Sequence, residues 1–351
     1  MSNKKILIIH HSGLFGGAGI SIFNIWRELS KRYKVVGYIP NDPPDLFNYF
    51  MKKGISPKTF TFKLGKIPYF SGGQSPKNIK FWYHTFHSLF QINFWNRVIK
   101  KEEPDLIIVN SKVLCWMGKL LKDNNSLCFV RETMKGNPDN IFNSVIRSML
   151  ENFTFVSFLS EYDLLQTGLK TPTTFVSPDF IYLKDYVDKL GKTRACKQLK
   201  IDPNNFNVGY VGGLNRLKGM DIVMQAMNIL KNEDINLIVA GDNPLKNSHK
   251  VPFQKIVRRN DKAFVTFVKS YIEANRLENK IKFVGSLYDI SLLYSSVDVL
   301  IFPMRRPHQA RPAFEIGAQK KTVIISDFPN IREYFTHGIN CLTFDPKDPN
   351  S

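Results

Sequence analysis

Short apolar runs alternate with longer amphipathic stretches along most of this chain of 351 residues. Residues 6–10 form an apolar run of the length expected for a buried strand, and residues 20–31 place Ile22, Trp26 and Leu29 on one helical face. This alternation predicts an α/β fold, with parallel sheets covered by helices on both faces. Further strands are expected at residues 34–39, 106–110, 126–131, 153–159 and 174–177, with helices at 112–122 and 140–151.

The regular alternation stops after residue 177 and starts again at Val208. Between these points, two prolines and an Asn-Asn pair accompany a basic stretch at residues 189–200, which is expected to be helical. The pattern predicts a first domain over residues 1–178, a hinge over 179–205 and a second domain over 206–351.

The stretch NVGYVGGLNRLKGMD has the pattern of a site for a diphosphate. An apolar strand leads into Gly212 and Gly213, and then Arg216 and Lys218 open a helix. Small residues allow the backbone to approach phosphates, the helix N-terminus directs amides towards them, and lysine neutralises their charge. A cation in the first turn of a helix opposes the helix dipole, which makes Lys218 the strongest single candidate for an anion contact.

A second helix is expected to begin near Pro312, because proline is well tolerated at the first helical position. The amides around Ala313 and Phe314 would then face a phosphate, while Glu315 would reach ribose hydroxyls. An alternative is that Glu315 only interacts with the helix dipole. Other candidates precede this helix, after the strand that ends in VLIFP: Arg305, Arg306, His308 and Arg311.

These segments resemble a known family. VGYVGGLNRLKGMD, IKFVGSLYDISLLYSSVDVLIFP and RPAFEIGAQKKTVIISD are similar to the C-terminal domain of glycosyltransferase family 4, and KKILIIHHSGLFGGAGISIFNIWREL is similar to its first strand, glycine loop and helix. The resemblance implies a GT-B fold, in which two Rossmann-like domains face each other across a cleft. It also implies transfer of a hexose from a nucleotide sugar to an acceptor hydroxyl, with retention of configuration and without a metal or other cofactor. The second domain would bind the donor and the first the acceptor.

Three residues of the first domain become candidates with this resemblance. Gly16 and Gly17 follow the first strand and open a helix, where a backbone without Cβ atoms can approach the donor diphosphate or the acceptor. Glu132 follows the strand SLCFVR, and two interpretations of it are open. It would orient the acceptor hydroxyl or act as a base, or it would only pair with Arg131.

The sequence also departs from the family pattern. Gly213 stands where the family has an arginine, and Arg216 is a possible replacement. Pro307 stands where the family has the first Glu of a Glu-x7-Glu pair. In the family, further helices follow the point that corresponds to residue 351, and the last of them braces the first domain. The sequence is therefore expected either to be truncated, with weaker domain coupling and reduced activity, or to stabilise its two domains differently. Two alternatives therefore stay open: a catalytically weak relative that binds a nucleotide or a protein, and a nucleotide-sugar epimerase.

Composition sets outer limits on the function. The content of 43% hydrophobic and 23% charged residues is that of an ordinary globular protein. Four widely spaced cysteines show no disulfide or zinc pattern, and neither a signal peptide nor an apolar stretch of about 18 residues is recognised. These observations predict a cytoplasmic protein. The family resemblance implies an enzyme at the cytoplasmic face of a bacterial membrane that builds a surface glycan on a glycan or lipid-linked acceptor.

The net charge of +19 is concentrated in part in residues 46–101, which hold ten Lys or Arg, fourteen aromatic residues and no Asp or Glu. Within this segment residues 78–101 are expected to form one amphipathic helix. Basic and aromatic residues on such a helix are typical of contact with an anionic membrane. The other open interpretation is that the aromatic residues pack on the sheet and the lysines are solvated. Nucleic acid is a less favoured partner, because no nucleic-acid motif accompanies the charge. The predicted membrane or acceptor surface comprises Lys77, Lys80, Trp82, Phe86, Trp95 and Arg97.

Overall fold

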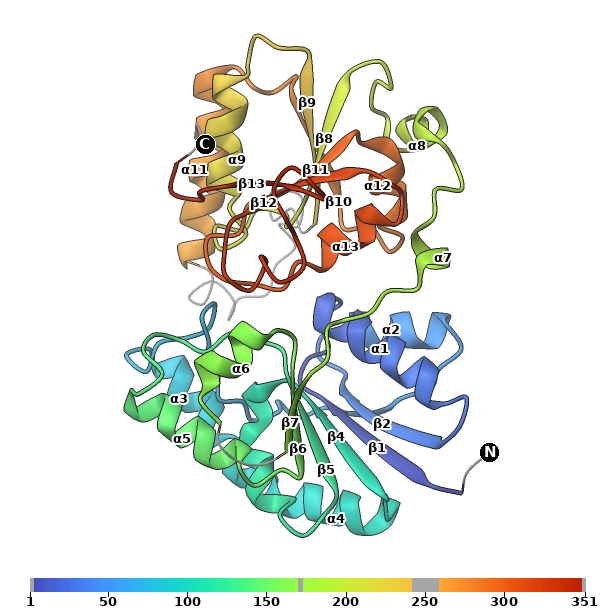
Figure 1. The fold of residues 1–351 in the computed structure, drawn as a ribbon, viewed down its shortest axis with the longest axis vertical. Helices are drawn as coiled ribbons and strands as arrows, with labels where there is room; N and C mark the ends of the chain where they lie inside the picture. Colours follow the sequence, from blue (N-terminus) through green and yellow to red (C-terminus); the bar gives the residue numbers. More distant parts are fainter. Residues whose placement is uncertain (1–2, 170–172, 242–258, 349–351) are drawn as a thin grey trace. The chain divides into compact units, whose positions relative to one another are not determined.

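The computed structural model describes residues 3–169, 173–241 and 259–348, which form two α/β units (Figure 1). The division falls between Phe180 and Ile181. Residues 181–205, predicted to be a hinge, therefore belong to the second unit. They contain the helices α7 (Leu183–Tyr186) and α8 (Lys192–Leu199), and α8 packs within that unit.

The first unit contains a sheet of seven parallel strands in the order β3-β2-β1-β4-β5-β6-β7. The strands are β1 (Lys5–His10), β2 (Lys34–Pro40), β3 (Lys58–Phe60), β4 (Leu106–Asn110), β5 (Ser126–Val130), β6 (Phe155–Phe158) and β7 (Thr173–Val176). The helices are α1 (Gly17–Leu29), α2 (Asp45–Lys52), α3 (Ile79–Phe86), α4 (Ile92–Glu102), α5 (Ile141–Leu150) and α6 (Glu161–Thr167), with 3-10 helices η1 (Leu89–Gln91) and η2 (Lys112–Leu120).

Both faces of this sheet are buried, which explains the continuous apolar runs of its strands. Ile6 and Ile8 of β1 pack in a cluster with residues of α1 and α2. The alternate residues, Leu7 and Ile9, pack in a second cluster with residues of α4, η2 and α5 on the opposite face. Period-two alternation along one strand thus supplies two cores.

The prediction of a single helix over residues 78–101 is wrong, because this segment forms three separate helices, α3, η1 and α4. The cause is a tertiary contact near Ser88. A Cβ atom on Gly65 would lie 2.3 Å from Ser88 N. The loop that contains Gly65 can therefore pack against the backbone at Ser88 only because residue 65 is a glycine. The buried side chain of Gln91 accepts a hydrogen bond from Gly65 N and donates one to Lys63 O. None of the helices in the described ranges is long and apolar enough to cross a membrane.

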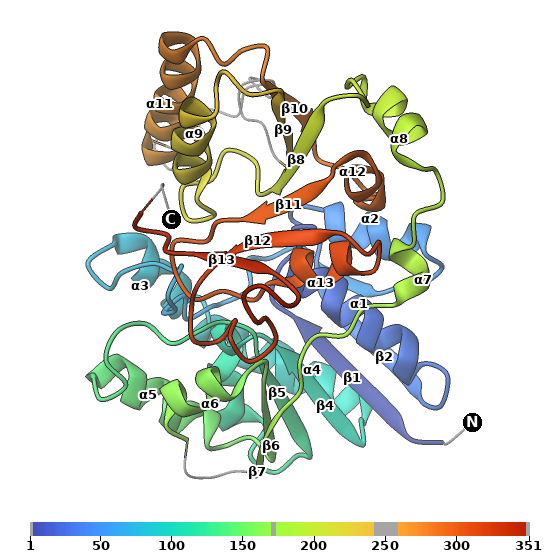
Figure 2. The same cartoon turned by 45° about the horizontal axis from the view of Figure 1, so that its top comes forward.

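The second unit contains a sheet of six parallel strands in the order β10-β9-β8-β11-β12-β13 (Figure 2). One cluster packs α9 and α11 on one face, and another packs α12, α13 and Tyr186 of α7 on the other. The strands are β8 (Phe206–Val211), β9 (Ile235–Ala240), β10 (Ile281–Gly285), β11 (Val299–Phe302), β12 (Thr322–Ser326) and β13 (Leu342–Phe344). Besides α7 and α8, the helices are α9 (Met220–Ile229), α11 (Arg259–Asn275), α12 (Ser291–Ser296) and α13 (Arg311–Gly317).

A buried carboxylate ties three strands of the first unit to α4. Glu102 accepts hydrogen bonds from Lys58 and from Tyr38, and it forms an ion pair with Lys5 at 2.9 Å. Burial alone would raise the pKa of Glu102, but the hydrogen bonds from Lys58, Lys5 and Tyr38 outweigh it and hold the pKa at about 2.

Because the folded pKa of Glu102 lies below the unfolded value of 4.5, its contribution to stability is complete above about pH 4.5 and is lost as the pH falls towards about 2. We expect Glu102→Gln to lower the free energy of unfolding by about 1–3 kcal/mol at pH 7, and by progressively less below pH 4.5. The exposed neighbour Glu103 is the matched control, and Glu103→Gln should change stability by less than about 0.5 kcal/mol. Chemical denaturation over this pH range measures both, and a deficit of Glu102→Gln that does not shrink in acid would contradict the assignment.

Candidate functional site

Each sheet reverses its strand order at one point, and ligands of open parallel sheets bind outside the carboxyl ends of the strands at such points. In the first unit the reversal lies between β1 and β4, and in the second between β8 and β11. The loop after β8 carries Lys218 and the loop after β11 carries Arg305. Lys218 and Arg305, both candidates from the sequence, therefore lie at the position that the topology favours.

Close backbone packing joins these two loops. Gly219 has a φ of +77°, and a Cβ atom there would lie 1.7 Å from Pro303 O. Arg305 N donates a hydrogen bond to Leu217 O at 3.2 Å. Only glycine fits at position 219, and this contact places Lys218 beside the loop that follows β11.

The charges at this position are mainly positive. Asp221, in the first turn of α9, accepts two hydrogen bonds from the guanidinium group of Arg305, at 3.0 and 2.7 Å. Arg216 lies 3.6 Å from the same carboxylate, but its side chain is 72% exposed. With Lys218, these residues give a cationic cluster at the N-terminus of a helix, which suits a phosphate group.

Lys218 itself is partly buried, and burial lowers the pKa of its ammonium group. Its stem passes over Gly212, where a Cβ atom would lie 3.0 Å from Lys218 Cδ. Within the described ranges, no carboxylate pairs with Lys218 Nζ. A desolvated cation without a counterion gains more from an incoming anion than a solvated one does.

The backbone amides of Gly212 and Gly213 form hydrogen bonds within the second unit. Gly212 N and Gly213 N both donate hydrogen bonds to Ala240 O, at 2.9 and 3.0 Å, so neither amide is directed at a ligand. Gly213 has a φ of +58°, which closes the turn after β8. These glycines therefore provide space and turn geometry, and their contact with a donor stays a prediction.

Glu315 and Arg311 lie in the interior of the second unit. Glu315 is 4% exposed and accepts hydrogen bonds from Tyr186, Tyr294 and, at 2.6 Å, Arg311 Nε. This cluster attaches α7 and α12 to α13. Burial, and then the charge of Glu315, raises the pKa of Tyr186 above its usual range. The predicted contacts of Glu315 with ribose and of Arg311 with phosphate stay predictions, and their internal pairing was not foreseen.

The expected free amides at the start of α13 are not free. Ala313 N and Phe314 N both point back to Ala310 O, at 2.8 and 3.4 Å. The helix begins at Arg311, and Pro312 has no amide to offer. This short helix therefore does not supply the phosphate-binding amides that the sequence predicted.

In the first unit, Glu132 does not pair with Arg131. Its carboxylate accepts hydrogen bonds from Ser111 Oγ and from Lys112 N, while Arg131 pairs with Asp179. Burial raises the pKa of Glu132, although the bond from Ser111 opposes this change. Ser111 has a φ of +104°, unusual for a residue with a side chain, and such strain is often found at functional sites.

A polar network that was not predicted lies at the reversal between β1 and β4. His10 is buried, and its Nδ1 lies 2.8 Å from Asn110 Nδ2, which leaves Nδ1 as an acceptor. Arg131 Nε donates to Asn110 Oδ1 at 2.9 Å. Burial, followed by the charge of His11, lowers the pKa of His10 well below its usual value, so His10 is neutral. The available signal was the position of His10 and Asn110 at the ends of two apolar runs.

The predicted loop glycines lie next to this network. Gly16 precedes α1 in an extended conformation, and Gly17 is the first residue of the helix. No atom lies within 4 Å of the position that a Cβ atom on Gly16 would occupy. A ligand could therefore approach the backbone at Gly16, but a residue with a side chain would also fit at this position.

The second unit is similar in sequence to a known protein family. Residues 192–351 match the family model of the glycosyl transferases group 1. The matched segment contains Lys218, Asp221, Arg305 and Glu315, and it covers most of the second unit. The match agrees with the coarser part of the predicted resemblance, and assignment to family 4 itself stays a prediction.

The chain is also similar in sequence to a curated relative and in fold to several solved structures. The chain is 26% identical over 160 residues to the O-antigen biosynthesis glycosyltransferase WclY of Escherichia coli, a match that covers 46% of this chain and 39% of the relative. The fold resembles HepE of Anabaena, in complex with UDP and glucose, with a TM-score of 0.76, 19% identity and coverage of 99% of this chain and 87% of the other. The fold also resembles sucrose-phosphate synthase from Thermosynechococcus elongatus, with a TM-score of 0.72, 19% identity and coverage of 99% of this chain and 87% of the other. These neighbours confirm the GT-B fold class, and the comparisons support the prediction of a glycosyltransferase.

The predicted membrane or acceptor surface is only partly a surface. Trp95 is fully buried and packs edge-on against Tyr38 and Phe60, so its assignment to the surface was wrong. Trp82 and Phe86 are exposed on α3. The remaining members, Lys77 and Lys80 before and within α3 and Arg97 on α4, are exposed or partly exposed.

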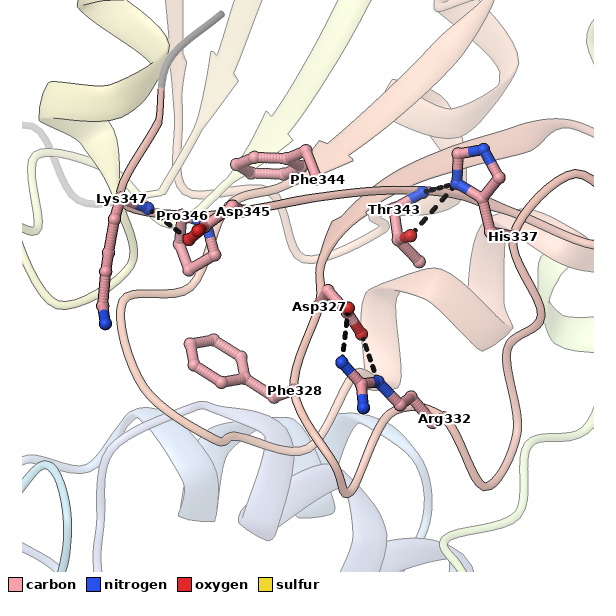
Figure 3. A pocket seen from close by; sticks show the side chains of 9 residues that line it. All are labelled: Asp327, Phe328, Arg332, His337, Thr343, Phe344, Asp345, Pro346 and Lys347. Atoms are coloured by element: carbon pink, nitrogen blue, oxygen red, sulfur yellow. Dashed lines mark hydrogen bonds and ion pairs between the residues drawn. The ribbon is translucent and has the colours of Figure 1, made fainter. Parts of the chain in front are cut away.

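A separate hollow lies at the carboxyl ends of β12 and β13 (Figure 3). Asp327 and Arg332 form a two-bonded ion pair in it, with both distances 2.7 Å, and His337 Nδ1 accepts a hydrogen bond from Thr343 N. None of the residues predicted to bind the donor lines this hollow. Among the described residues, no group of three or more His, Cys, Asp or Glu side chains is placed to hold a metal ion. That the reaction needs no metal or other cofactor stays a prediction.

The two helix-opening glycines allow a matched test of the site geometry. We expect Gly219→Ala to lower the free energy of unfolding by about 2 kcal/mol or more, because the new methyl group meets Pro303 O at a positive φ. Gly16→Ala should change it by less than about 0.5 kcal/mol, because the methyl group enters open space. Thermal and chemical unfolding measure both variants. Equal stability of the two would show that the loops after β8 and β11 are not packed as described.

Proposed function

We propose that the chain transfers a hexose from a nucleotide sugar to an acceptor hydroxyl during synthesis of a bacterial surface glycan. The observation that carries this proposal is Lys218, a partly buried cation at the reversal point of the second sheet, within the segment that matches the glycosyl transferases group 1. Support for the pathway comes from WclY, which is named for O-antigen biosynthesis, and for the donor from HepE, whose structures contain UDP or UDP-glucose.

In the proposed reaction the acceptor oxygen forms a bond to C1 of the sugar while the bond from C1 to the diphosphate oxygen breaks. The proton of the acceptor hydroxyl passes to the departing phosphate or to a base. Lys218 and the start of α9 would stabilise the negative charge that develops on the diphosphate. Arg305, whose orientation Asp221 fixes, and the more exposed Arg216 would add positive charge. We propose retention of configuration and no metal requirement, as the family resemblance implies.

We assign the acceptor to the first unit, at the reversal between β1 and β4. Glu132 is the proposed group that orients the acceptor hydroxyl, and its raised pKa makes its carboxylate a better proton acceptor than an ordinary glutamate. The neutral His10 would face uncharged polar groups of the acceptor. We propose a glycan or lipid-linked acceptor, reached at the cytoplasmic face of the membrane.

The donor site is tested by binding and hydrolysis of UDP-, GDP-, ADP- and dTDP-sugars. We expect one nucleotide to raise the melting temperature of the wild type, with UDP-glucose as the first to try. Lys218→Ala should weaken that binding by about 10- to 100-fold, because a charge-assisted bond to phosphate is lost. Lys218→Met is a second variant that keeps the stem over Gly212, and it should lose as much.

The matched controls separate charge from folding. Arg216→Ala should weaken binding less than Lys218→Ala, because the side chain is 72% exposed and its charge is screened. Glu315→Gln retains the shape of the buried cluster, and its effect on binding shows whether Glu315 also meets the ribose. Absence of stabilisation by every nucleotide would refute the donor site. Binding without transfer to any acceptor would favour a binding module, and interconversion of the donor without acceptor would favour an epimerase.

A further inference from the structure

The helix α3 and the following η1 present an apolar face that the rest of the first unit leaves uncovered. Phe81 is the buried residue of α3. Around it, Ile79 and Phe90 are each 83% exposed, and Phe86 and Leu89 are more than half exposed. We name the exposed residues Ile79, Trp82, Tyr83, Phe86, Leu89 and Phe90 the α3–η1 face.

This face is held outward by contacts beneath it. Phe81 packs edge-on against Tyr69 and Phe142 in the core. Trp82 Nε1 donates a hydrogen bond to Pro76 O at 2.8 Å, and its ring stacks on Phe86 with centroids 6.0 Å apart. These contacts hold the rings of Trp82 and Phe86 at the surface of α3. Monomeric proteins seldom leave such a contiguous apolar surface without a partner.

The apolar surface extends to the neighbouring helix α5. Phe142 of α5 lies 6.5 Å from the ring of Trp82. On either side of Phe142, Ile141 and Val145 are exposed. Two helices of the same unit thus contribute apolar side chains next to one another, as α3 and α5 are drawn in Figure 1.

Positive charge surrounds the face. The pKa of His84 of α3 is lowered mainly by burial. Nearby positive charges lower it further, and these come from Lys66, Lys63, His87 and Lys80. Lys63 also lies 5.8 Å from the ring centroid of Tyr83. The whole segment of residues 46–101 contains no Asp or Glu. A face with this charge fits a negatively charged partner.

Exposed aromatic and aliphatic side chains flanked by lysines are typical of proteins that bind the interface of an anionic lipid bilayer. The aromatic rings lie there at the level of the headgroups, and the lysines contact lipid phosphates. A second copy of this chain is a poorer partner, because two identical basic surfaces repel one another. We propose that the α3–η1 face binds the first unit to anionic lipid bilayers, with Trp82, Phe86 and Phe90 in the interface and Lys77 and Lys80 against the headgroups. This proposal goes beyond the proposed function, because binding to lipid requires no nucleotide sugar.

The test uses the full chain with vesicles of phosphatidylcholine alone or mixed with phosphatidylglycerol. We expect co-sedimentation with the mixed vesicles that weakens as salt is added, and much weaker binding to the neutral vesicles. Replacing both Phe86→Ser and Phe90→Ser should reduce binding about tenfold or more. Replacing Lys77→Gln and Lys80→Gln should reduce it about fivefold for each lysine.

Tryptophan fluorescence provides an independent readout. Of the four tryptophans, Trp82 is exposed and Trp26, Trp95 and Trp116 are buried. Addition of mixed vesicles should therefore shift the emission to shorter wavelength through Trp82, and Trp82→Phe should abolish the shift.

Two control variants separate the face from general effects. Ile339→Ser replaces an exposed apolar residue of the second unit, and Trp95→Phe alters a buried tryptophan; both should bind vesicles as the wild type does. Melting temperatures establish that the variants are folded. The proposal is overturned if the folded wild type does not bind the mixed vesicles, or if the variant with both Phe86→Ser and Phe90→Ser binds them as strongly as the wild type. It is also overturned if the face instead mediates self-association that the same variant abolishes. The rise in melting temperature with nucleotide sugars is measured separately, so a failure of lipid binding would not count against the proposed donor site.

Discussion

The reversal of strand order in each parallel sheet is the constraint on which the rest of this structure depends. Connections on the two sides of a reversal leave towards opposite faces, so the carboxyl ends of two neighbouring strands stay accessible. In the second unit these strands are β8 and β11, and in the first they are β1 and β4. The proposed donor cluster lies in the loops after β8 and β11. In the proposed acceptor cluster, His10 and Asn110 end β1 and β4, and Glu132, which follows β5, is held by Ser111 directly after β4.

The two reversal points differ in their chemistry. Cations gather in the second unit, where Lys218 and Arg305 come from loops packed together at Gly219 and Pro303. The first unit places mixed groups at its reversal: Glu132 is held by Ser111, His10 is held by Asn110, and the cation Arg131 is paired with Asp179. One position suits a group that carries negative charge, and the other suits hydroxyl groups. This difference is what a transfer from a diphosphate to a sugar-like acceptor requires.

Much of the fold followed from periodicity, because strands buried on both faces give continuous apolar runs that are visible in the sequence. Lys218 was selected as a candidate for a similar reason, because the pattern that indicates it lies within a few residues, and its role stays a prediction. Predictions failed where contacts between distant residues decide the outcome. Gln91 and Gly65 break a helix that local spacing favours, and Trp95 lies on the inner side of the resulting α4. The pairing of Glu315 with Arg311 and two tyrosines depends on three helices, which no single motif records.

Asp221 has a consequence for the end of the catalytic cycle. A carboxylate beside the proposed diphosphate position opposes part of the positive charge of Arg305 and Arg216. The nucleoside diphosphate that leaves carries one more negative charge than the nucleotide sugar that entered, so this repulsion acts more strongly on the product than on the substrate. By the same proposal, Asp221 would favour product release and limit product inhibition, at some expense of affinity for the donor.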